Sequence, residues 1–210
     1  LSGGGKVHVV DQDSTPLKEG TYYTRFSVNN LSDQTRFVIK LTTGNEIVVG
    51  IDGNSNWFWE DGKTYGYFKG FGVSVNTEYE LQVNLVMTGA NTCTLEPVVN
   101  GVSLGKSGNI YHDGAAGKAG FSTRNVARTF TVKEFYFTNA PKHVINVTAS
   151  GKGSVSQTGA VTAFEEADKT LFFTPEEGER ITKVLADGVD VTDKVQDNSY
   201  TFAYSLNDHT

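Results

Sequence analysis

The sequence reads TRFVIKLTTGNEIVVGI from Thr35 to Ile51, and this stretch shows the fold class most directly. Residues 35–41 and 46–51 are rich in β-branched and aromatic side chains, which favour strands. Between them, Thr43-Gly44-Asn45 consists of residue types that favour turns. The stretch therefore predicts two neighbouring antiparallel strands joined by a short turn.

The same two-residue periodicity continues on both sides of this hairpin. Asp61-Gly62 and Asn100-Gly101 are dipeptides suited to two-residue hairpin turns. No stretch shows the 3.6-residue apolar period of an amphipathic helix. The sequence therefore predicts an all-β fold, with further strands at residues 22–28, 57–60, 63–68, 78–86, 92–99, 102–104 and 130–137.

A polar stretch that contains proline, Thr138-Asn139-Ala140-Pro141-Lys142, interrupts this pattern and predicts a domain boundary. Residues 1–140 are expected to form an antiparallel jelly-roll β-sandwich, and residues 141–210 a second, smaller β module. Short strands of the second module are expected at residues 144–149, 153–156, 170–174, 181–186 and 199–204.

The composition excludes several classes of protein. An apolar content of 38% with 11% aromatic residues is too high for a disordered chain. No uncharged apolar run reaches the length of a membrane span, so no membrane insertion is expected. The net charge of −6, without a basic stripe, argues against nucleic acid as a partner, because phosphates require a basic face.

Cys93 is the single cysteine, so the chain cannot form an intramolecular disulfide. Its position within a predicted strand favours a buried structural thiol. The sequence opens with Leu1-Ser2-Gly3-Gly4-Gly5 and shows no start methionine, signal peptide or anchor. We therefore expect a segment, monomeric in itself, of a larger multidomain chain.

The residues that most suggest a function are the aromatic residues of the hairpin predicted around Asp61-Gly62. A two-residue turn there would place both tryptophans on one face, Trp59 opposite Thr64 and Trp57 opposite Gly66. The other face would carry Phe58, Tyr65 and Tyr67. One of the two faces must belong to the core, and the sequence leaves open which one.

This aromatic surface indicates a carbohydrate site. Sugars present a flat C–H face that stacks on aromatic rings, while nearby amides and carboxylates bond the hydroxyl groups. Because the residues opposite the tryptophans are small, their rings would stay uncovered and form the stacking platform. If the tryptophans are core residues instead, the site moves to the tyrosines or to the loop Tyr111–Gly114. The candidate carbohydrate-binding residues are Trp57, Trp59, Tyr65, Tyr67, Asp52, Asn54 and Asn56.

The segment Asp52–Asn56 begins like a calcium-binding loop, but the rest of the pattern is missing. Trp57 occupies the position that requires glycine, and Lys63 stands where a bidentate glutamate belongs. The four histidines are scattered without the spacing of metal ligands. We therefore expect no metal and no cofactor at this hairpin, and a calcium ion elsewhere stays open.

The first region resembles the concanavalin A-like, laminin G-like jelly-roll superfamily over about residues 5–139. The resemblance rests on the order of its strands. A strand at 22–28 precedes the hairpins, residues 77–83 precede a strand that ends in Val98-Val99-Asn100-Gly101, and Ala119-Gly120-Phe121-Ser122 leads into a last strand that ends at Phe137. The resemblance implies a domain that binds glycans without catalysis.

The region from about 142 to 210 is similar to an internalin-type repeat of bacterial surface proteins. The matching elements are Gly151–Val155, Thr174–Gly178, Ala186-Asp187-Gly188 and Tyr200-Thr201-Phe202. Asn207–Thr210 would precede a last strand in such a repeat. An Ig-like module is the alternative for this region. The resemblance implies a module that spaces or presents other domains on a cell surface.

No catalytic pair of carboxylates is expected. Retaining glucanases on the lectin-like fold carry a Glu-x-Asp-x-x-Glu strand, and here Glu166-Ala167-Asp168 is followed by Leu171 instead of the second glutamate. The expected function is therefore a non-catalytic polysaccharide-binding module of a secreted or cell-surface bacterial protein. The alternative is a structural or adhesive stalk segment that binds a protein partner or no ligand.

Overall fold

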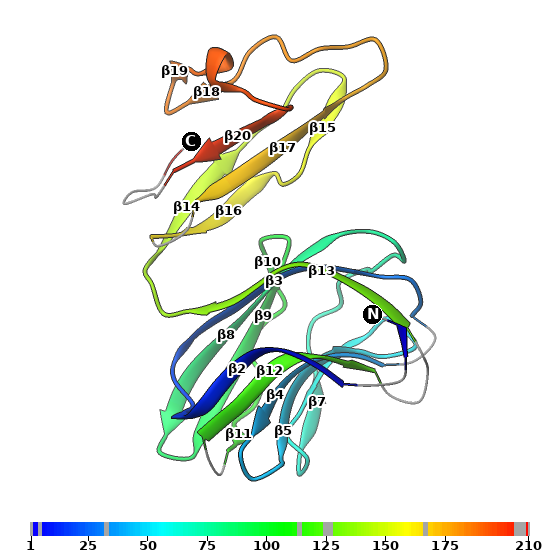
Figure 1. Cartoon of the computed structure of the whole chain (residues 1–210), viewed down its shortest axis with the longest axis vertical. Helices are drawn as coiled ribbons and strands as arrows, with labels where there is room; N and C mark the ends of the chain where they lie inside the picture. Colours follow the sequence, from blue (N-terminus) through cyan, green and yellow to red (C-terminus); the bar gives the residue numbers. More distant parts are fainter. Residues whose placement is uncertain are drawn as a thin grey trace. The chain divides into compact units, whose positions relative to one another are not determined.

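The computed structural model describes residues 2–3, 6–31, 34–112, 115–123, 128–165, 168–203 and 209. The chain divides into two compact units, Leu1–Asn139 and Ala140–Thr210. Strands make up both units (Figure 1), and the helical element of the described residues is a single 3₁₀ turn, η1 (Thr192–Lys194). The prediction of an all-β fold is confirmed. No helix in the described ranges has the length and apolarity needed to cross a membrane.

The first unit consists of two antiparallel sheets. One sheet has the order β1 (Ser2–Gly3), β13 (Arg128–Thr138), β3 (Gly20–Val28), β8 (Tyr79–Gly89), β9 (Thr92–Val99) and β10 (Val102–Ser103), and β11 (Ile110–Tyr111) also pairs with β9. The other has the order β2 (Lys6–Pro16), β12 (Ala115–Thr123), β4 (Thr35–Leu41), β5 (Glu46–Ile51), β6 (Trp57–Glu60) and β7 (Tyr65–Tyr67).

The core of the first unit lies between these sheets, because aromatic rings of one sheet contact rings of the other. Tyr22 of β3 lies 5.4 Å from Phe37 of β4, and Phe26 of β3 lies 5.3 Å from Phe121 of β12, measured between ring centroids. Burying such a side chain contributes about 1.5–3 kcal/mol. The two layers form the predicted jelly-roll sandwich.

The hairpin predicted from residues 35–51 forms as expected, between β4 and β5. Val38 pairs with Val48 and Ile39 with Ile47, and Gly44 adopts a φ of +96° in the turn. Ile39 and Ile47 face the core between the sheets. Val38 and Val48 face the opposite side of the sheet, yet both are fully buried. A small apolar cluster therefore lies on the outer face of this sheet.

Cys93 lies in the core with no exposed surface, as predicted for a structural thiol. Burial, together with the nearby charge of Asp61, raises the pKa of its thiol to about 12. A thiol in this setting stays protonated at neutral pH.

The second unit contains three small antiparallel sheets. They are β14 (Lys142–Val147) with β16 (Gly159–Phe164), β15 (Gly153–Val155) with β17 (Lys169–Pro175) and β20 (Ser199–Phe202), and β18 (Leu185–Ala186) with β19 (Val189–Asp190). Ile145, Val161 and Ala163 form its core, with Val147 and Phe202 packed against them. These strands form the smaller β module.

The strand predicted at residues 181–186 is wrong, because only Leu185 and Ala186 form a strand. Val184 donates its N–H to Thr192 Oγ1 and accepts from the N–H of Val191, which ties the segment to η1 rather than to a sheet. Tyr204, the last residue of the strand predicted at 199–204, lies outside the described residues.

Candidate functional site

The hairpin between β6 and β7 turns one residue later than the sequence predicts. Asp61 N–H donates to the Thr64 carbonyl oxygen (3.1 Å), and the residue with positive φ is Gly62, at +83°. Glu60 therefore pairs with Tyr65, and Trp59 with Gly66. The predicted pairing of Trp59 with Thr64 is wrong by two residues. A shift of two keeps every side chain on its predicted face.

The side chain of Asp61 causes this shift. Its Oδ1 accepts from the N–H groups of Lys63 (2.8 Å) and Thr64 (2.7 Å), and its Oδ2 accepts from the N–H of Tyr111 (3.0 Å). Burial opposes ionisation of this carboxyl, but the hydrogen bonds outweigh burial and lower its pKa. Asp61 therefore begins an Asx-type turn instead of occupying a central turn position.

The tryptophans belong to the core face, so the predicted stacking platform is not available. Trp57 is 1% exposed, and its indole Nε1 donates to the Phe71 carbonyl oxygen at 3.1 Å. Trp59 is half-buried against the core, and a Cβ atom at Gly66 would lie 2.8 Å from its Nε1. The small residue opposite Trp59 does not uncover the ring; it lets the ring pack against the backbone.

The tyrosines occupy the other face and are exposed. Tyr65 is 64% and Tyr67 58% exposed, and their ring centroids lie 5.5 Å apart with the planes at 79°. A hydrogen bond with Tyr65 and the charges of Tyr65 and Asp52 raise the pKa of Tyr67. The structure therefore presents the alternative pair of the sequence analysis, on the outer face of the six-stranded sheet.

Two cross-strand rows lead from these tyrosines across the outer face. Arg36, Gly50, Phe58 and Tyr67 are successive neighbours in one row. Val38, Val48, Glu60 and Tyr65 are successive neighbours in the other. We call Arg36, Phe58, Glu60, Tyr65 and Tyr67 the outer-face cluster.

The floor of this cluster is apolar and its centre is charged. Phe58 is 3% exposed and packs with Val38 and Val48. Above this floor the guanidinium of Arg36 forms an ion pair with the Glu60 carboxylate. Arg36 Nη1 also lies 3.9 Å from Glu46 Oε2. Arg36 and Glu60 were not predicted from the sequence as site residues, although their alternation with buried residues on β4 and β6 places them on this face.

The predicted polar residues form the loop beside Tyr67. Asp52 Oδ1 accepts from the N–H of Asn54 (2.8 Å) and of Asn56 (2.9 Å), and its Oδ2 accepts from Asn56 Nδ2 (3.2 Å). Asp52 and Asn56 continue the alternation of Gly50 and Phe58, so they extend the outer-face rows. Asn54 is exposed in the same loop. The structure thus places the Asp52 carboxylate close enough to Tyr67 to act on its pKa, and Asp52 holds Asn54 and Asn56 in the same loop.

The alternative loop at Tyr111 also adjoins the hairpin. The Tyr111 ring centroid lies 4.0 Å from Lys63 Nζ, and the residue is 39% exposed. Asp113 and Gly114 of that loop lie outside the described residues. Within the described ranges, no group of three or more histidine, cysteine, aspartate or glutamate side chains is arranged to hold a metal ion.

A buried polar network lies on the seven-stranded sheet. Glu80 accepts from the Tyr23 hydroxyl (2.7 Å) at Oε2 and from Gln82 Nε2 (3.0 Å) at Oε1. Burial, and then the charge and hydrogen bond of Glu80, raise the pKa of Tyr23. Oε2 of Glu80 thus links β8 to β3, while Oε1 accepts a hydrogen bond within β8.

Comparison with known proteins gives no family. No protein-family model matches the sequence, and no curated protein matches it. Among solved structures, a tetrameric galectin from the ball sponge Cinachyrella sp. is similar over 61% of this chain and 96% of its own, with 16% identity and a TM-score of 0.43. Scytalido-glutamic peptidase with a transition-state analogue inhibitor is similar over 90% of this chain and 94% of its own, with 13% identity and a TM-score of 0.30.

Proposed function

We propose that this chain is a non-catalytic carbohydrate-binding module, and that it binds a polysaccharide or oligosaccharide at the outer-face cluster. The observation that carries the proposal is the exposure of Tyr65 and Tyr67, which are 64% and 58% exposed on a paired strand. Leaving a large aromatic side chain exposed to water costs free energy. Two neighbouring exposed tyrosines therefore indicate a surface that binds a ligand.

The neighbours of the tyrosines suit a sugar. The rings offer faces for the C–H surface of a pyranose, and Arg36, Glu60 and Asn56 supply donors and acceptors for hydroxyl groups. Because Arg36 and Glu60 already hold one another, their positions are fixed before a ligand arrives, which lowers the entropy cost of binding.

Catalysis is not part of the proposal. Glycoside hydrolysis requires two carboxyl groups on either side of the bond that breaks. Glu60 and Glu46 are the carboxylates at the centre of this face, and both lie against the guanidinium of Arg36. A carboxylate paired in this way is a poor general acid, because the ion pair favours its ionised form.

The location of the protein and the role of its second unit are also proposals. We infer that the protein is secreted or on the cell surface of a bacterium, and that the second unit acts as an internalin-type spacer in a larger chain. Its support is the resemblance described for residues 142–210 and the small core of that unit, centred on Ile145.

A structural or adhesive stalk remains the second candidate. Exposed tyrosines on a flat sheet edge also occur in protein interfaces. Sugar binding requires the rings together with their polar neighbours, whereas a stalk without a ligand requires neither.

Affinity-gel electrophoresis in a panel of soluble polysaccharides, followed by a glycan array, tests the proposal. We expect retardation of the wild-type chain and loss of retardation in the double variant Tyr65→Ala, Tyr67→Ala. The matched control is Phe172→Ala, which removes a 42% exposed ring from the second unit. Equal retardation of the double variant would refute this site, and absence of any glycan ligand would favour the stalk.

A further inference from the structure

The two exposed tyrosines of the outer-face cluster do not form a flat platform. The planes of the Tyr65 and Tyr67 rings meet at 79°, with their centroids 5.5 Å apart. A hydrogen bond also joins the two side chains, which restricts the rotation of either ring. When one ring turns its face to a ligand, the other presents its edge. The pair therefore forms a corner, and only one of its rings can lie flat against a planar surface.

The cluster is also stepped in height. Tyr65 and Tyr67 stand on β7 with 64% and 58% of their surface exposed. Their neighbours on β6 are recessed: Tyr67 pairs with Phe58, which is 3% exposed, and Tyr65 pairs with Glu60, whose side chain is 26% exposed. On the next strand, β5, Val48 has no exposed surface. The tyrosines are therefore a raised wall beside a lower floor.

The polar groups of the cluster lie at the foot of this wall. Arg36 belongs to β4, but its guanidinium reaches the Glu60 carboxylate on β6. Adjacent strands lie about 4.8 Å apart, so the ion pair is one strand away from the tyrosines. A sugar residue that stacks on a tyrosine ring can thus direct a hydroxyl group to Arg36 or Glu60.

We propose that the outer-face cluster binds single, soluble glycan chains and not the surface of a crystalline polysaccharide. This inference rests on the proposed function and adds the physical form of the ligand to it. A single chain can turn one residue against a tyrosine and lower its hydroxyl groups to the recessed ion pair. A crystalline surface is planar and rigid, so it would contact one tyrosine face at most and would stay above Arg36 and Glu60. Covering those groups without bonding them costs free energy.

The first experiment compares the two physical forms of a polysaccharide. The intact chain is mixed with microcrystalline cellulose and with crystalline chitin, and its depletion from the supernatant is measured. The same protein is run in gels that contain hydroxyethylcellulose, glycol chitin and the other soluble polysaccharides of the affinity panel. We expect retardation by at least one soluble polysaccharide and no depletion by either crystalline material.

Single variants test the corner and the step separately. Tyr65→Ala and Tyr67→Ala should act unequally on binding to the soluble polysaccharide, because only one ring turns its face to the sugar. One variant should weaken binding at least about tenfold and the other less than about threefold. Glu60→Gln breaks the ion pair with Arg36 and should also weaken binding. Circular dichroism of each variant confirms that the fold is retained.

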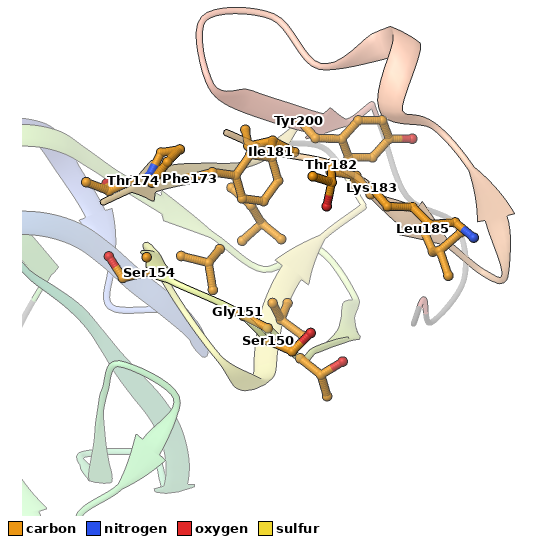
Figure 2. A pocket seen from close by; sticks show the side chains of 18 of the residues that line it. Ser150, Gly151, Ser154, Phe173, Thr174, Ile181, Thr182, Lys183, Leu185 and Tyr200 are labelled. Atoms are coloured by element: carbon orange, nitrogen blue, oxygen red, sulfur yellow. The ribbon is translucent and has the colours of Figure 1, made fainter. Parts of the chain in front are cut away.

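The matched control removes a tyrosine from another concave surface. The second unit contains a groove of about 590 Å³, whose lining includes Phe173, Ile181 and Tyr200 (Figure 2). Tyr200→Ala should leave glycan binding unchanged. Loss of binding in this variant would assign the glycan to the second unit and would overturn the proposal.

The outcomes separate this inference from the proposed function. Depletion by crystalline cellulose or chitin that Tyr65→Ala and Tyr67→Ala weaken equally would overturn the inference, while carbohydrate binding by the cluster would stand. Unchanged binding of Glu60→Gln would show that the glycan does not reach the recessed ion pair, and would also overturn it. Absence of binding to every soluble and crystalline glycan would overturn both.

Discussion

The Phe58 ring lies directly over Gly50 of the neighbouring strand, and a Cβ atom at position 50 would meet Phe58 Cζ at 2.5 Å. Gly50→Ala should therefore push this ring out of the floor of the outer-face cluster and cost about 1–3 kcal/mol of unfolding free energy. Urea denaturation measures the loss. Gly70→Ala is the control, because no heavy atom lies within 4 Å of its Cβ position; equal effects of the two variants would contradict this packing.

The two kinds of aromatic residue in the β6–β7 hairpin should respond differently to truncation. Trp57→Ala removes a fully buried ring and should cost about 3–5 kcal/mol in the free energy of unfolding. Tyr65→Ala should change stability by less than about 0.5 kcal/mol, because the side chain is exposed. Thermal unfolding by circular dichroism compares them. A stable Trp57→Ala variant would show that the faces of the hairpin are assigned the wrong way round.

The charge beside Tyr67 should select against acidic sugars. Arg36 and Glu60 neutralise one another, and Asp52 adds a carboxylate next to Tyr67. We expect binding to neutral polysaccharides to exceed binding to uronate-rich ones at low salt. Asp52→Asn should reduce the difference in affinity between neutral and uronate-rich polysaccharides. The loop should keep its conformation, because the amide oxygen still accepts from the N–H groups of Asn54 and Asn56. Asp193→Asn in the second unit is the control, and a preference for uronates would reverse the proposed charge selectivity.

The buried hydroxyl of Tyr23 should make stability fall at alkaline pH. Its pKa is raised in the folded protein, first by burial and then by Glu80, whereas an unfolded tyrosine ionises near pH 10. Above about pH 10 the unfolded state therefore binds fewer protons than the native state, and the unfolding free energy declines as pH rises. Urea denaturation from pH 8 to 11 should show a smaller decline for Tyr23→Phe. A decline as steep as in the wild type would contradict this, and Tyr65→Phe is the exposed control.

The hairpin turns show what the sequence could predict and what it could not. Asn100 and Gly101 both adopt positive φ, and Val99 pairs with Val102, so this dipeptide forms the two-residue turn expected of it. Asp61-Gly62 is a similar dipeptide, but Asp61 Oδ1 accepts hydrogen bonds from the N–H groups of Lys63 and Thr64. These bonds move the turn one residue along the chain. The difference depends on side-chain hydrogen bonds that residue types alone do not specify.

The candidate site was predicted in part. The sequence identified the right hairpin and both of its faces, but the choice of face depends on which strands lie on either side of it. The Trp59 ring packs against Gly66 and against Gly108, which is distant in sequence. The two-residue periodicity of a strand cannot predict the contact with Gly108. Arg36 and Glu60 come from separate strands, and their ion pair follows from the register across β5.

Thiol labelling of the single cysteine can measure how often the folded first unit opens. Cys93 is fully buried with a raised thiol pKa, so maleimide or iodoacetamide cannot reach a reactive thiolate until the sandwich opens. The rate of labelling in native buffer then reports how often the first unit opens. Cys93 is the only thiol in the sequence, so the fraction of protein that gains the mass of one label measures opening of the sandwich. The second unit contributes no thiol to this signal.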